Sequence, residues 1–510
     1  MGGARTAMIA LDAADLSLLY HCVEMGHMPV FGELLKRGCS GKLSSLGRWL
    51  PGSVWPSFYT SSAPSQTGFH HYLQWSSQEM ALRRPEPLSM GTPFWRCLTN
   101  EGAQVIAIDM PFASAPSAGI ELTGWATLDS LEPPCAHPLE LLSEIQTRLG
   151  PSPRVDEMHA LQTFQALRQL RDEQIQIAGM LAELSEFLLA RETADLFLLT
   201  FPGLHRGGHW LWDESGLLAA PPSSERKELE AALPAVYAAT DQALGRVLDA
   251  ADADEIILFS LHGMGPNTSR VEILDDMLSL VLADGGQVTR PLKLWEQMRK
   301  VLPPTLRHAV KTNLPTKLQD RLTGFWRTGG RNWKTTPALT QVADLTGYIR
   351  LNISGREADG VLSKDDALEL CERVSEGFAT FVDADSGKPV VQRVARIDEV
   401  VQEGPRRELL PDLMVDWSDI PAARHRSIVS DTFGSIDWPT PGRHPSGRSG
   451  NHRAEGFYLA FGAGLPQGDG PSGSILDLAP TVLSRLGITV PEQFQGAPLL
   501  GGSDDNRDPA

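Results

Sequence analysis

Four short apolar runs in this chain each end in polar residues of the kind that bind metals or anions. Asp12 follows AMIAL, Ser53 lies in LPGSVWPSF, His205 and His209 follow LFLLTF, and His262 follows EIILFS. Apolar strands with polar side chains at their carboxyl ends are typical of a parallel sheet whose active site lies at that edge. This pattern therefore predicts an α/β protein and places its site residues at the ends of strands.

The segments between these runs have helical patterns. MPVFGELLKRG predicts a helix that ends at a glycine, and GKLSS predicts the strand after it. A long helical pattern over 157–190 leads to DLFLLTF, and LEAALPAVYAATDQALGRVLDAA leads to EIILFS. Since parallel strands need long crossover connections, we expect a mostly parallel central sheet with helices on both faces.

A basic stretch divides the chain. Between Thr289 and Ala338 there are 11 lysines and arginines but only two acidic residues, a local charge of +9 in a chain of −18. We therefore expect a catalytic α/β domain in two parts, 1–268 and 339–500, separated by an inserted basic cap over 269–338 and followed by a disordered tail, 501–510. The segments GYIRLNISGRE, DLMVDW and FYLAFG are expected to resume the sheet. The cap could attract anionic nucleotides, or it could be a solvated face or a membrane- or partner-binding surface.

Composition excludes several classes of protein. The net charge of −18 and the pI near 5.2 argue against nucleic-acid binding. Five scattered cysteines without a CxxC spacing indicate reduced thiols. No run approaches the roughly 20 apolar residues of a membrane span, and the N-terminus is unlike a signal peptide, so we expect a cytoplasmic protein. The sequence leaves the oligomeric state open.

One carboxylate, one hydroxyl and several imidazoles form the ligand set of a metal-assisted phosphoryl or sulfuryl transfer site. His452 in RSGNHRAEG adds an imidazole near the C-terminus, with His444 as its competitor. Structural roles remain open for the same residues. Asp12 and Ser53 could only cap helices, and His262 could be a core histidine.

Taken together, these segments resemble the alkaline phosphatase superfamily, and within it the type I phosphodiesterase/nucleotide pyrophosphatase family. The matching pieces are ALDAAD, SVWPSFYTSSAPSQTGFHH, HRGGH, SLHGMG and GNHRAEG. The resemblance spans nearly the whole chain outside the basic stretch, and the motifs are specific jointly although each is weak alone.

The resemblance implies a site with two metal ions about 4 Å apart that clamp the attacking and leaving oxygens. Ser53 would be the nucleophile, at the start of a helix, and His262 would share its metal. The implied ligands are Asp12, Ser53 and His262 for one ion and His205, His209 and His452 for the other. His70, His71 and Arg206 are implied to bind substrate, with the two histidines also positioning the nucleophile loop.

Two departures from the family pattern change the expected metal content. Leu261 stands where the family has the aspartate of Asp-His-Gly, and His205 stands where it has another aspartate. We therefore expect one zinc or other divalent ion held by imidazoles, with the second site weakly occupied or empty. Alternatively, no metal binds and the histidines act as acids, bases and hydrogen-bond donors.

The nucleophile also departs from the pattern. The family residue lies two positions before a proline, but Ser53 lies three before Pro56, and Val54 takes the family position. Ser57 and Thr60 are the alternative nucleophiles.

The function predicted is that of a phosphodiesterase or nucleotide-pyrophosphatase-like hydrolase acting on a small anionic, nucleotide-like phosphoester. One alternative is a transferase that moves a sulfuryl or phosphoryl group from a nucleotide donor to a small hydroxylated acceptor, with or without metal. Another is a degenerate, non-catalytic protein that binds an anion or a partner.

Overall fold

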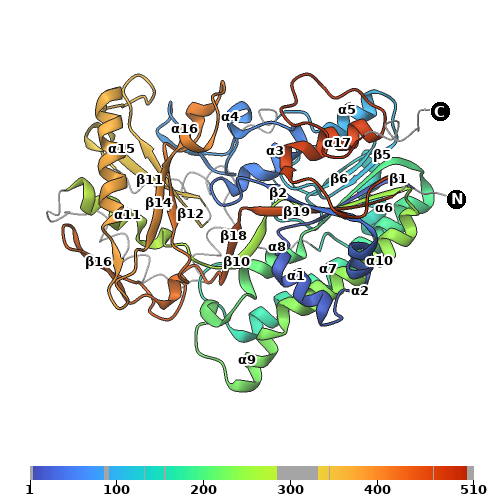
Figure 1. Cartoon of the computed structure of the whole chain (residues 1–510), viewed down its shortest axis with the longest axis horizontal. Coiled ribbons are helices and arrows are strands. Elements are labelled where there is room, and N and C mark those ends of the chain that lie inside the picture. Colours follow the sequence, from blue (N-terminus) through green and yellow to red (C-terminus); the bar gives the residue numbers. More distant parts are fainter. Residues whose placement is uncertain are drawn as a thin grey trace. The chain divides into compact units, whose positions relative to one another are not determined.

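The computed structural model describes residues 4–85, 91–130, 133–153, 157–283, 331–343, 345–462 and 464–501. Most of the predicted cap, 284–330, and nearly all of the predicted tail, 502–510, lie outside the described residues. The chain forms two compact units. The first comprises Met1–Thr67, Pro87–Asn267 and Arg443–Ala510, and the second comprises Gly68–Glu86 and Thr268–Gly442 (Figure 1).

The first unit is built on a sheet of ten strands with the order β20-β2-β19-β9-β1-β8-β5-β6-β7, in which β21 also pairs with β2. Its central strands β9, β1, β8, β5 and β6 are all parallel. Among the described strands of this sheet, only β19 and β7 run antiparallel to their neighbours. The strands are β1 (Ala4–Leu11), β2 (Cys39–Ser44), β5 (Val105–Ile108), β6 (Ile120–Thr123), β7 (Cys135–His137), β8 (Ala194–Phe201), β9 (Glu255–Ser260), β19 (Glu455–Gly462), β20 (Gly468–Asp469) and β21 (Gly473–Ser474).

Strand β1 lies at the middle of this sheet, between β8 and β9. It is apolar because both of its faces are covered, which is the usual condition of a parallel strand. Ala10 is in register with Thr200 of β8 and with Phe259 of β9. The three strands therefore end at the same edge, directly before the polar residues that the sequence placed there.

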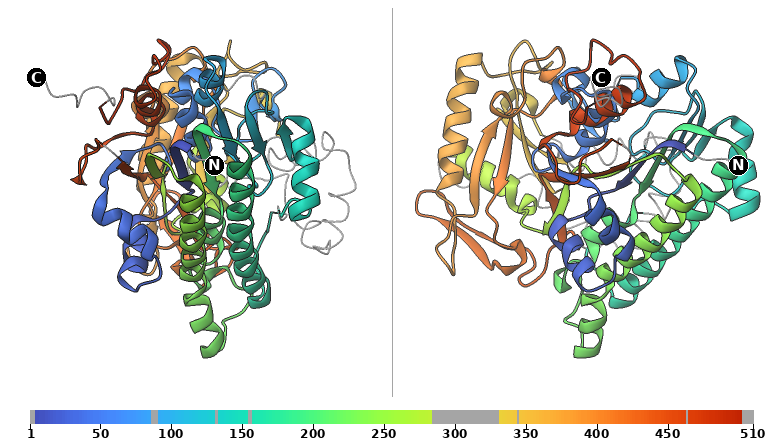
Figure 2. Two further views of the ribbon diagram at one scale, coloured as in Figure 1. Left: turned by 90° about the vertical axis from the view of Figure 1, so that its right-hand side faces the viewer. Right: turned by 45° about the vertical axis from the view of Figure 1, so that its right-hand side comes forward.

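Helices cover both faces of the sheet, which confirms the predicted fold class. In Figure 1, α3, α5 and α17 lie on one face, and α1, α2, α7 and α10 lie on the other. The long helices α7 and α10 pack side by side, as the left view of Figure 2 shows. The helices are α1 (Leu16–Glu24), α2 (Pro29–Arg37), α3 (Val54–Thr60), α4 (Pro64–Thr67), α5 (Phe94–Asn100), α6 (Leu139–Leu149), α7 (Phe164–Arg191), α8 (Gly203–Trp210), α9 (Ser223–Glu230), α10 (Ala232–Ala251) and α17 (Leu478–Arg485).

Helix α2 shows how side chains fix these helices. Its first amide groups have no partner within the helix, and Asp241 of α10 supplies one. The Asp241 carboxylate accepts hydrogen bonds from the backbone N–H groups of Val30 (2.9 Å) and Phe31 (2.8 Å). Gly38 then ends α2, at a point where a Cβ atom would lie 2.7 Å from the carbonyl oxygen of Ala460 in β19.

The second unit has an antiparallel sheet of its own, with the order β11-β12-β15-β14. GYIRL and DLMVDW, which were expected to resume the parallel sheet, form β12 and β15 of this sheet, so that expectation is wrong. Periodicity alone does not distinguish parallel from antiparallel pairing. Here β11 ends at Ala343 and β12 begins at Thr346, and parallel strands need a much longer connection. FYLAFG, by contrast, forms β19 of the central sheet. The elements are β3 (Gln74–Ser76), β4 (Ala81–Arg83), β11 (Ala338–Ala343), β12 (Thr346–Leu351), β13 (Val382–Asp383), β14 (Val391–Arg396), β15 (Leu413–Trp417), β16 (Ser427–Ser430), β17 (Gly434–Asp437), α11 (Val271–Leu282), α15 (Lys364–Ala379) and α16 (Ile397–Val400).

A buried polar group ties the second unit together. His425 Nδ1 lies 2.7 Å from Asp383 Oδ1, and Arg270 Nε donates to His425 Nε2 at 3.0 Å. Asp383 also accepts a hydrogen bond from the backbone N–H of Ser386 (2.9 Å). Since buried charges are costly unless they are paired, this group is a structural one.

Within the described part of the chain, no helix is both long enough and apolar enough to cross a bilayer.

Candidate metal centre

Asp12 follows directly after β1, at the edge of the central sheet where β1, β8 and β9 end. Its side chain is almost fully buried. Its backbone N–H donates to the carbonyl oxygen of Phe201, the last residue of β8 (3.2 Å). Its carboxylate oxygen Oδ1 accepts the indole N–H of Trp55 (3.1 Å). These contacts fix the carboxylate between the end of β8 and the helix that follows Ser53.

His205 and His209 lie on α8, which begins two residues after the end of β8. Residues four apart share one face of a helix, so both rings point the same way. Gly450 lets the backbone of β18 (Gly450–Arg453) come close to this helix. A Cβ on Gly450 would lie only 2.0 Å from the carbonyl oxygen of Gly208, and the carbonyl oxygen of Gly450 is 3.0 Å from His209 Nδ1.

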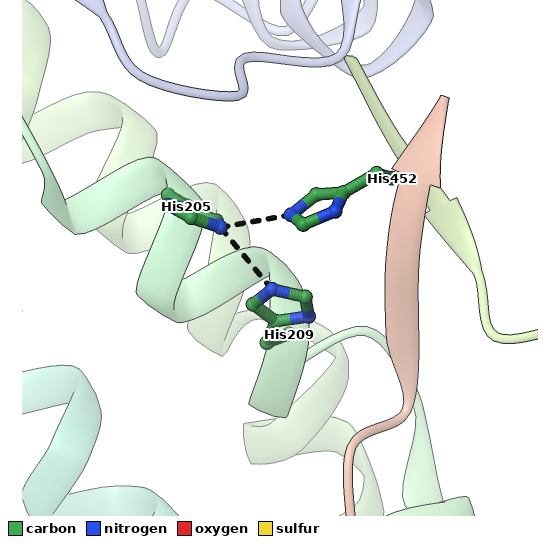
Figure 3. Close-up of side chains that lie close together, drawn as sticks. All are labelled: His205, His209 and His452. Carbon is green, nitrogen blue, oxygen red and sulfur yellow. Dashed lines mark hydrogen bonds between the residues drawn. The ribbon is translucent and has the colours of Figure 1, made fainter. Parts of the chain in front are cut away.

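His452 reaches the same point from β18 (Gly450–Arg453). This strand pairs antiparallel with β10 (Gly263–Pro266), which begins immediately after His262, and Met264 is in register with His452. His205 Nε2 lies 2.9 Å from His452 Nε2 and 3.2 Å from His209 Nε2 (Figure 3). We call His205, His209 and His452 the histidine cluster.

The other nitrogen of His205 faces two carboxylates. His205 Nδ1 is 3.0 Å from Asp12 Oδ2 and 3.3 Å from Asp129 Oδ2. Sequence reasoning missed Asp129, because it lies six residues beyond the short strand β6, whose IELT carries a glutamate and gives a weak apolar signal. A search for acidic residues in the loop after every strand, and not only directly at strand ends, would have found it.

The surroundings give the three imidazoles of the histidine cluster different pKa values. Burial acts to lower the pKa of His205, but the charges and hydrogen bonds of Asp12 and Asp129 raise it to about 10. Burial, followed by neighbouring cationic groups, holds the pKa of His209 and of His452 well below 6.5. Two members of the cluster are therefore neutral at pH 7, the form of imidazole that binds metals.

His262 contacts the cluster through its ring. Its ring centroid is 4.7 Å from that of His452 and 5.8 Å from that of His205. Burial lowers the pKa of His262 to about 4. Gly47 packs tightly against His262, since a Cβ on Gly47 would lie 2.7 Å from His262 Cβ. Leu261, next to it, is buried and has no ligand atom.

Ser53 is fully buried directly before α3, and its Oγ donates a hydrogen bond to the carbonyl oxygen of Leu50 (2.7 Å). Trp55, two residues along, connects this segment to the histidine cluster through its bond to Asp12. Of the two alternatives, Thr60 Oγ1 donates to the carbonyl oxygen of Pro56 (2.7 Å), and Ser57 is buried further along α3.

The remaining predicted site residues have other partners than the histidine cluster. His70 and His71 belong to the second unit, where Gln74 Oε1 accepts the backbone N–H of His70 (2.9 Å). Arg206 pairs with Glu157 at 3.0 Å. The competitor of His452, His444, is buried and hydrogen-bonds through Nδ1 to Ser446 Oγ (2.8 Å).

The three imidazoles of the histidine cluster could hold a metal ion. Zinc–nitrogen bonds of about 2.0–2.1 Å in a tetrahedral site place the ligand nitrogens about 3.3–3.4 Å apart; His205 Nε2 lies 3.2 Å from His209 Nε2 and 2.9 Å from His452 Nε2. Asp12, Asp129 and His205 Nδ1 form a second group of potential ligands that shares His205 with the first. A neutral imidazole offers one lone pair. His205 can therefore be a metal ligand in only one of these two groups at a time.

No protein-family model matches the sequence, and no curated protein matches it. Solved structures do. A mutant form of alkaline phosphatase PafA is 14% identical over 98% of this chain and 99% of that chain, with a TM-score of 0.50. Phosphonoacetate hydrolase from Sinorhizobium meliloti, in complex with phosphonoformate, is 13% identical over 94% of both chains, with a TM-score of 0.48. Human ectonucleotide pyrophosphatase/phosphodiesterase 5 is 12% identical over 96% of both chains, with a TM-score of 0.46.

The likeness to PafA covers nearly the whole of both chains, and the parallel sheet with helices on both faces is the architecture expected from the sequence resemblance. At 14% identity it shows the fold and not the activity. The chain has a fold like that of alkaline phosphatase PafA.

Proposed function

We propose that this protein is a hydrolase of small phosphoesters that uses one divalent metal ion, with zinc as the best candidate, and Ser53 as nucleophile. One observation carries the proposal: the Nε2 atoms of His209 and His452 both face Nε2 of His205, at 3.2 and 2.9 Å. Three convergent imidazoles with an open fourth position are typical of catalytic zinc sites.

The surroundings of the histidine cluster support this interpretation. The ring nitrogens that face away from the cluster meet acceptors, with Asp12 and Asp129 beside His205 and the carbonyl oxygen of Gly450 beside His209. Ligating histidines in proteins usually donate their second N–H to a carboxylate or a carbonyl in this way. The arrangement therefore fixes each of these two rings with Nε2 directed at the metal position.

A bound ion would act as a Lewis acid that polarises the phosphoryl oxygens and stabilises charge on them. Ser53 would attack phosphorus, its O–H leaving the hydrogen bond to the carbonyl oxygen of Leu50, while the bond from phosphorus to the ester oxygen breaks and the alcohol departs. Water would then cleave the phosphoserine and release the phosphate. His262, held neutral by burial, would be the base that accepts the serine proton. The family pattern has two aspartates that this chain lacks, and Asp129 would supply the negative charge of one of them.

A second candidate function is metal-free group transfer. The observation that favours it is His205, whose pKa of about 10 makes it an imidazolium when no metal is bound. In that form both ring nitrogens donate, Nδ1 to the carboxylates and Nε2 to a neighbouring imidazole. The positive charge would then stabilise a transferring phosphoryl or sulfuryl group.

The experiment that tests the proposal combines metal analysis with an assay. Protein stripped with a chelator is reconstituted with Zn²⁺, Mn²⁺ or Mg²⁺ and tested with bis-p-nitrophenyl phosphate, p-nitrophenyl phosphate and a p-nitrophenyl ester of a nucleoside monophosphate. We expect about one ion per chain and hydrolysis of at least one ester that depends on the ion.

Two variants identify the machinery. Ser53→Ala should keep the metal and lose at least about 100-fold in kcat, whereas His209→Ala should lose the metal and the activity together. Hydrolysis by stripped protein at the rate of the reconstituted one would refute metal dependence. A metal-free protein that transfers the group only when an alcohol acceptor is added would support the second candidate instead.

A further inference from the structure

We propose that Asp129 is a positioning residue of the metal centre, which fixes His205 in the tautomer and orientation that bind the ion. This inference rests on the proposed metal site and adds a residue that the sequence patterns do not contain. Asp129 would act through His205, not by contact with substrate or metal.

The geometry places Asp129 behind the ligand and not beside the ion. Asp129 Oδ2 is 3.3 Å from His205 Nδ1, on the opposite side of the ring from Nε2, which faces His209 and His452. Asp12 Oδ2 is 3.0 Å from the same Nδ1. A proton on Nδ1 therefore meets two acceptors, so this tautomer is favoured and the lone pair stays on Nε2.

The loop that carries Asp129 is fixed by a separate set of contacts. Asp109, fully buried at the end of β5, accepts the backbone N–H groups of Trp125 (2.6 Å) and Ala126 (2.5 Å). The carbonyl oxygen of Asp129 in turn accepts the N–H of Phe112 (2.7 Å). These contacts fix the loop at Trp125, Ala126 and Asp129, and so hold the Asp129 carboxylate beside His205.

Charge explains why a second carboxylate is useful here. The chain has Leu261 and His205 at two positions where the resembled family has aspartates, which leaves Asp12 as the one carboxylate among the predicted ligands. A divalent ion bound by three neutral imidazoles carries its full charge into a buried site, and such a charge is stabilised by nearby anions. Asp129 provides that anion through the ring of His205.

The test measures metal affinity and coordination, not activity. Parent protein, Asp129→Asn and Asp129→Ala are stripped, titrated with Co²⁺ and followed by visible absorption, and Zn²⁺ affinity is measured by competition with a chromogenic chelator. Asp195→Asn is the matched control, because Asp195 lies at the far end of β8, where it accepts the N–H of Gln104. Asp129 is one-third exposed, so both variants should fold.

We expect Zn²⁺ affinity to fall about 10- to 100-fold in both Asp129 variants, with the intense bands of four-coordinate Co²⁺ retained and affinity unchanged in Asp195→Asn. An affinity within about twofold of the parent would overturn the positioning role, as would a change of Co²⁺ coordination, which would make Asp129 a direct ligand. A parent that binds no ion would overturn it together with the metal centre. The expected pattern in a parent that hydrolyses no ester would support the positioning role while refuting the proposed function.

Discussion

Replacing Asp109 by asparagine tests whether a buried carboxylate holds the loop that carries Asp129. Asp109 has a φ of +58°, in the left-handed region that asparagine also tolerates. The substitution therefore preserves the backbone and nearly the volume, and changes the acceptors presented to the amide groups of Trp125 and Ala126. Asparagine can accept one of these N–H groups, but its own NH2 group would face the other.

The expected loss follows from these two hydrogen bonds. A hydrogen bond to a charged acceptor contributes about 1.5–3 kcal/mol, and Asp109→Asn removes one and weakens the other. One of the two amides should therefore open more readily by about that amount, which corresponds to exchange with solvent roughly 10- to 150-fold faster. Asp109→Ala should have a larger effect, because both acceptors go and alanine in the left-handed region adds about 1–2 kcal/mol.

Hydrogen exchange followed by mass spectrometry on peptides covering 124–130 measures this directly. Zn²⁺ affinity of the same variant should fall by less than in Asp129→Asn, because Asp109 is one step further from the ligand. Peptides from α15 of the second unit are the internal control and should exchange as in the parent. Unchanged exchange over 124–130 in Asp109→Asn would refute the role given to this carboxylate.

Three further outcomes are expected. Excess Zn²⁺ at about 100 times its dissociation constant should stabilise the parent by about 2.7 kcal/mol, and His209→Ala should lose this shift in a thermal unfolding scan; an equal shift in both would place the metal elsewhere. Asp241→Ala leaves two amide groups at the start of α2 without their carboxylate, so the free energy of unfolding should fall by about 2–4 kcal/mol, measured in urea, and a change below about 0.5 kcal/mol would contradict this. Burial acts to raise the pKa of Asp383, but hydrogen bonds from Ser386 and His425 lower it overall. The ionised carboxylate therefore stabilises the fold above about pH 4. This contribution is lost as the pH falls through the lowered pKa. Asp383→Asn should accordingly be less stable than the parent at about pH 7 and approach it in acid, whereas a constant difference from about pH 7 to pH 2 would contradict the assignment.

The sequence predicted those strands and helices whose own apolar pattern shows how they are buried. β1, β8 and β9 are continuous apolar runs because parallel strands are covered on both faces, and each was predicted with its polar residue. The helical pattern over 157–190 corresponds to α7, Phe164–Arg191. This helix begins where the Thr163 side chain accepts a hydrogen bond from the backbone N–H of Ala166. The start differs by seven residues because the cap, not the apolar period, sets where a helix begins.

The sequence could not predict which sheet a strand joins. β12 and β15 have the same apolar character as the strands of the central sheet, yet they pair antiparallel in the second unit. Pairing depends on which backbone groups meet in space, and the hydrophobic period carries no information about that partner. The same limit concealed Asp129, since its position beside His205 depends on β6 and β5 being neighbours and on the anchor from Asp109.

By itself, the sequence determined the fold class and the set of imidazoles, because strand ends and histidine spacing are local properties of the chain. Tertiary structure decided which of them meet: His452 and not His444 joins His205 and His209, because β18 pairs with β10 and Gly450 packs against α8. It also placed a carboxylate from a separate loop behind the central ligand. Those contacts join residues up to 247 positions apart, and only the packing of strands and helices around one sheet brings such residues within hydrogen-bond distance.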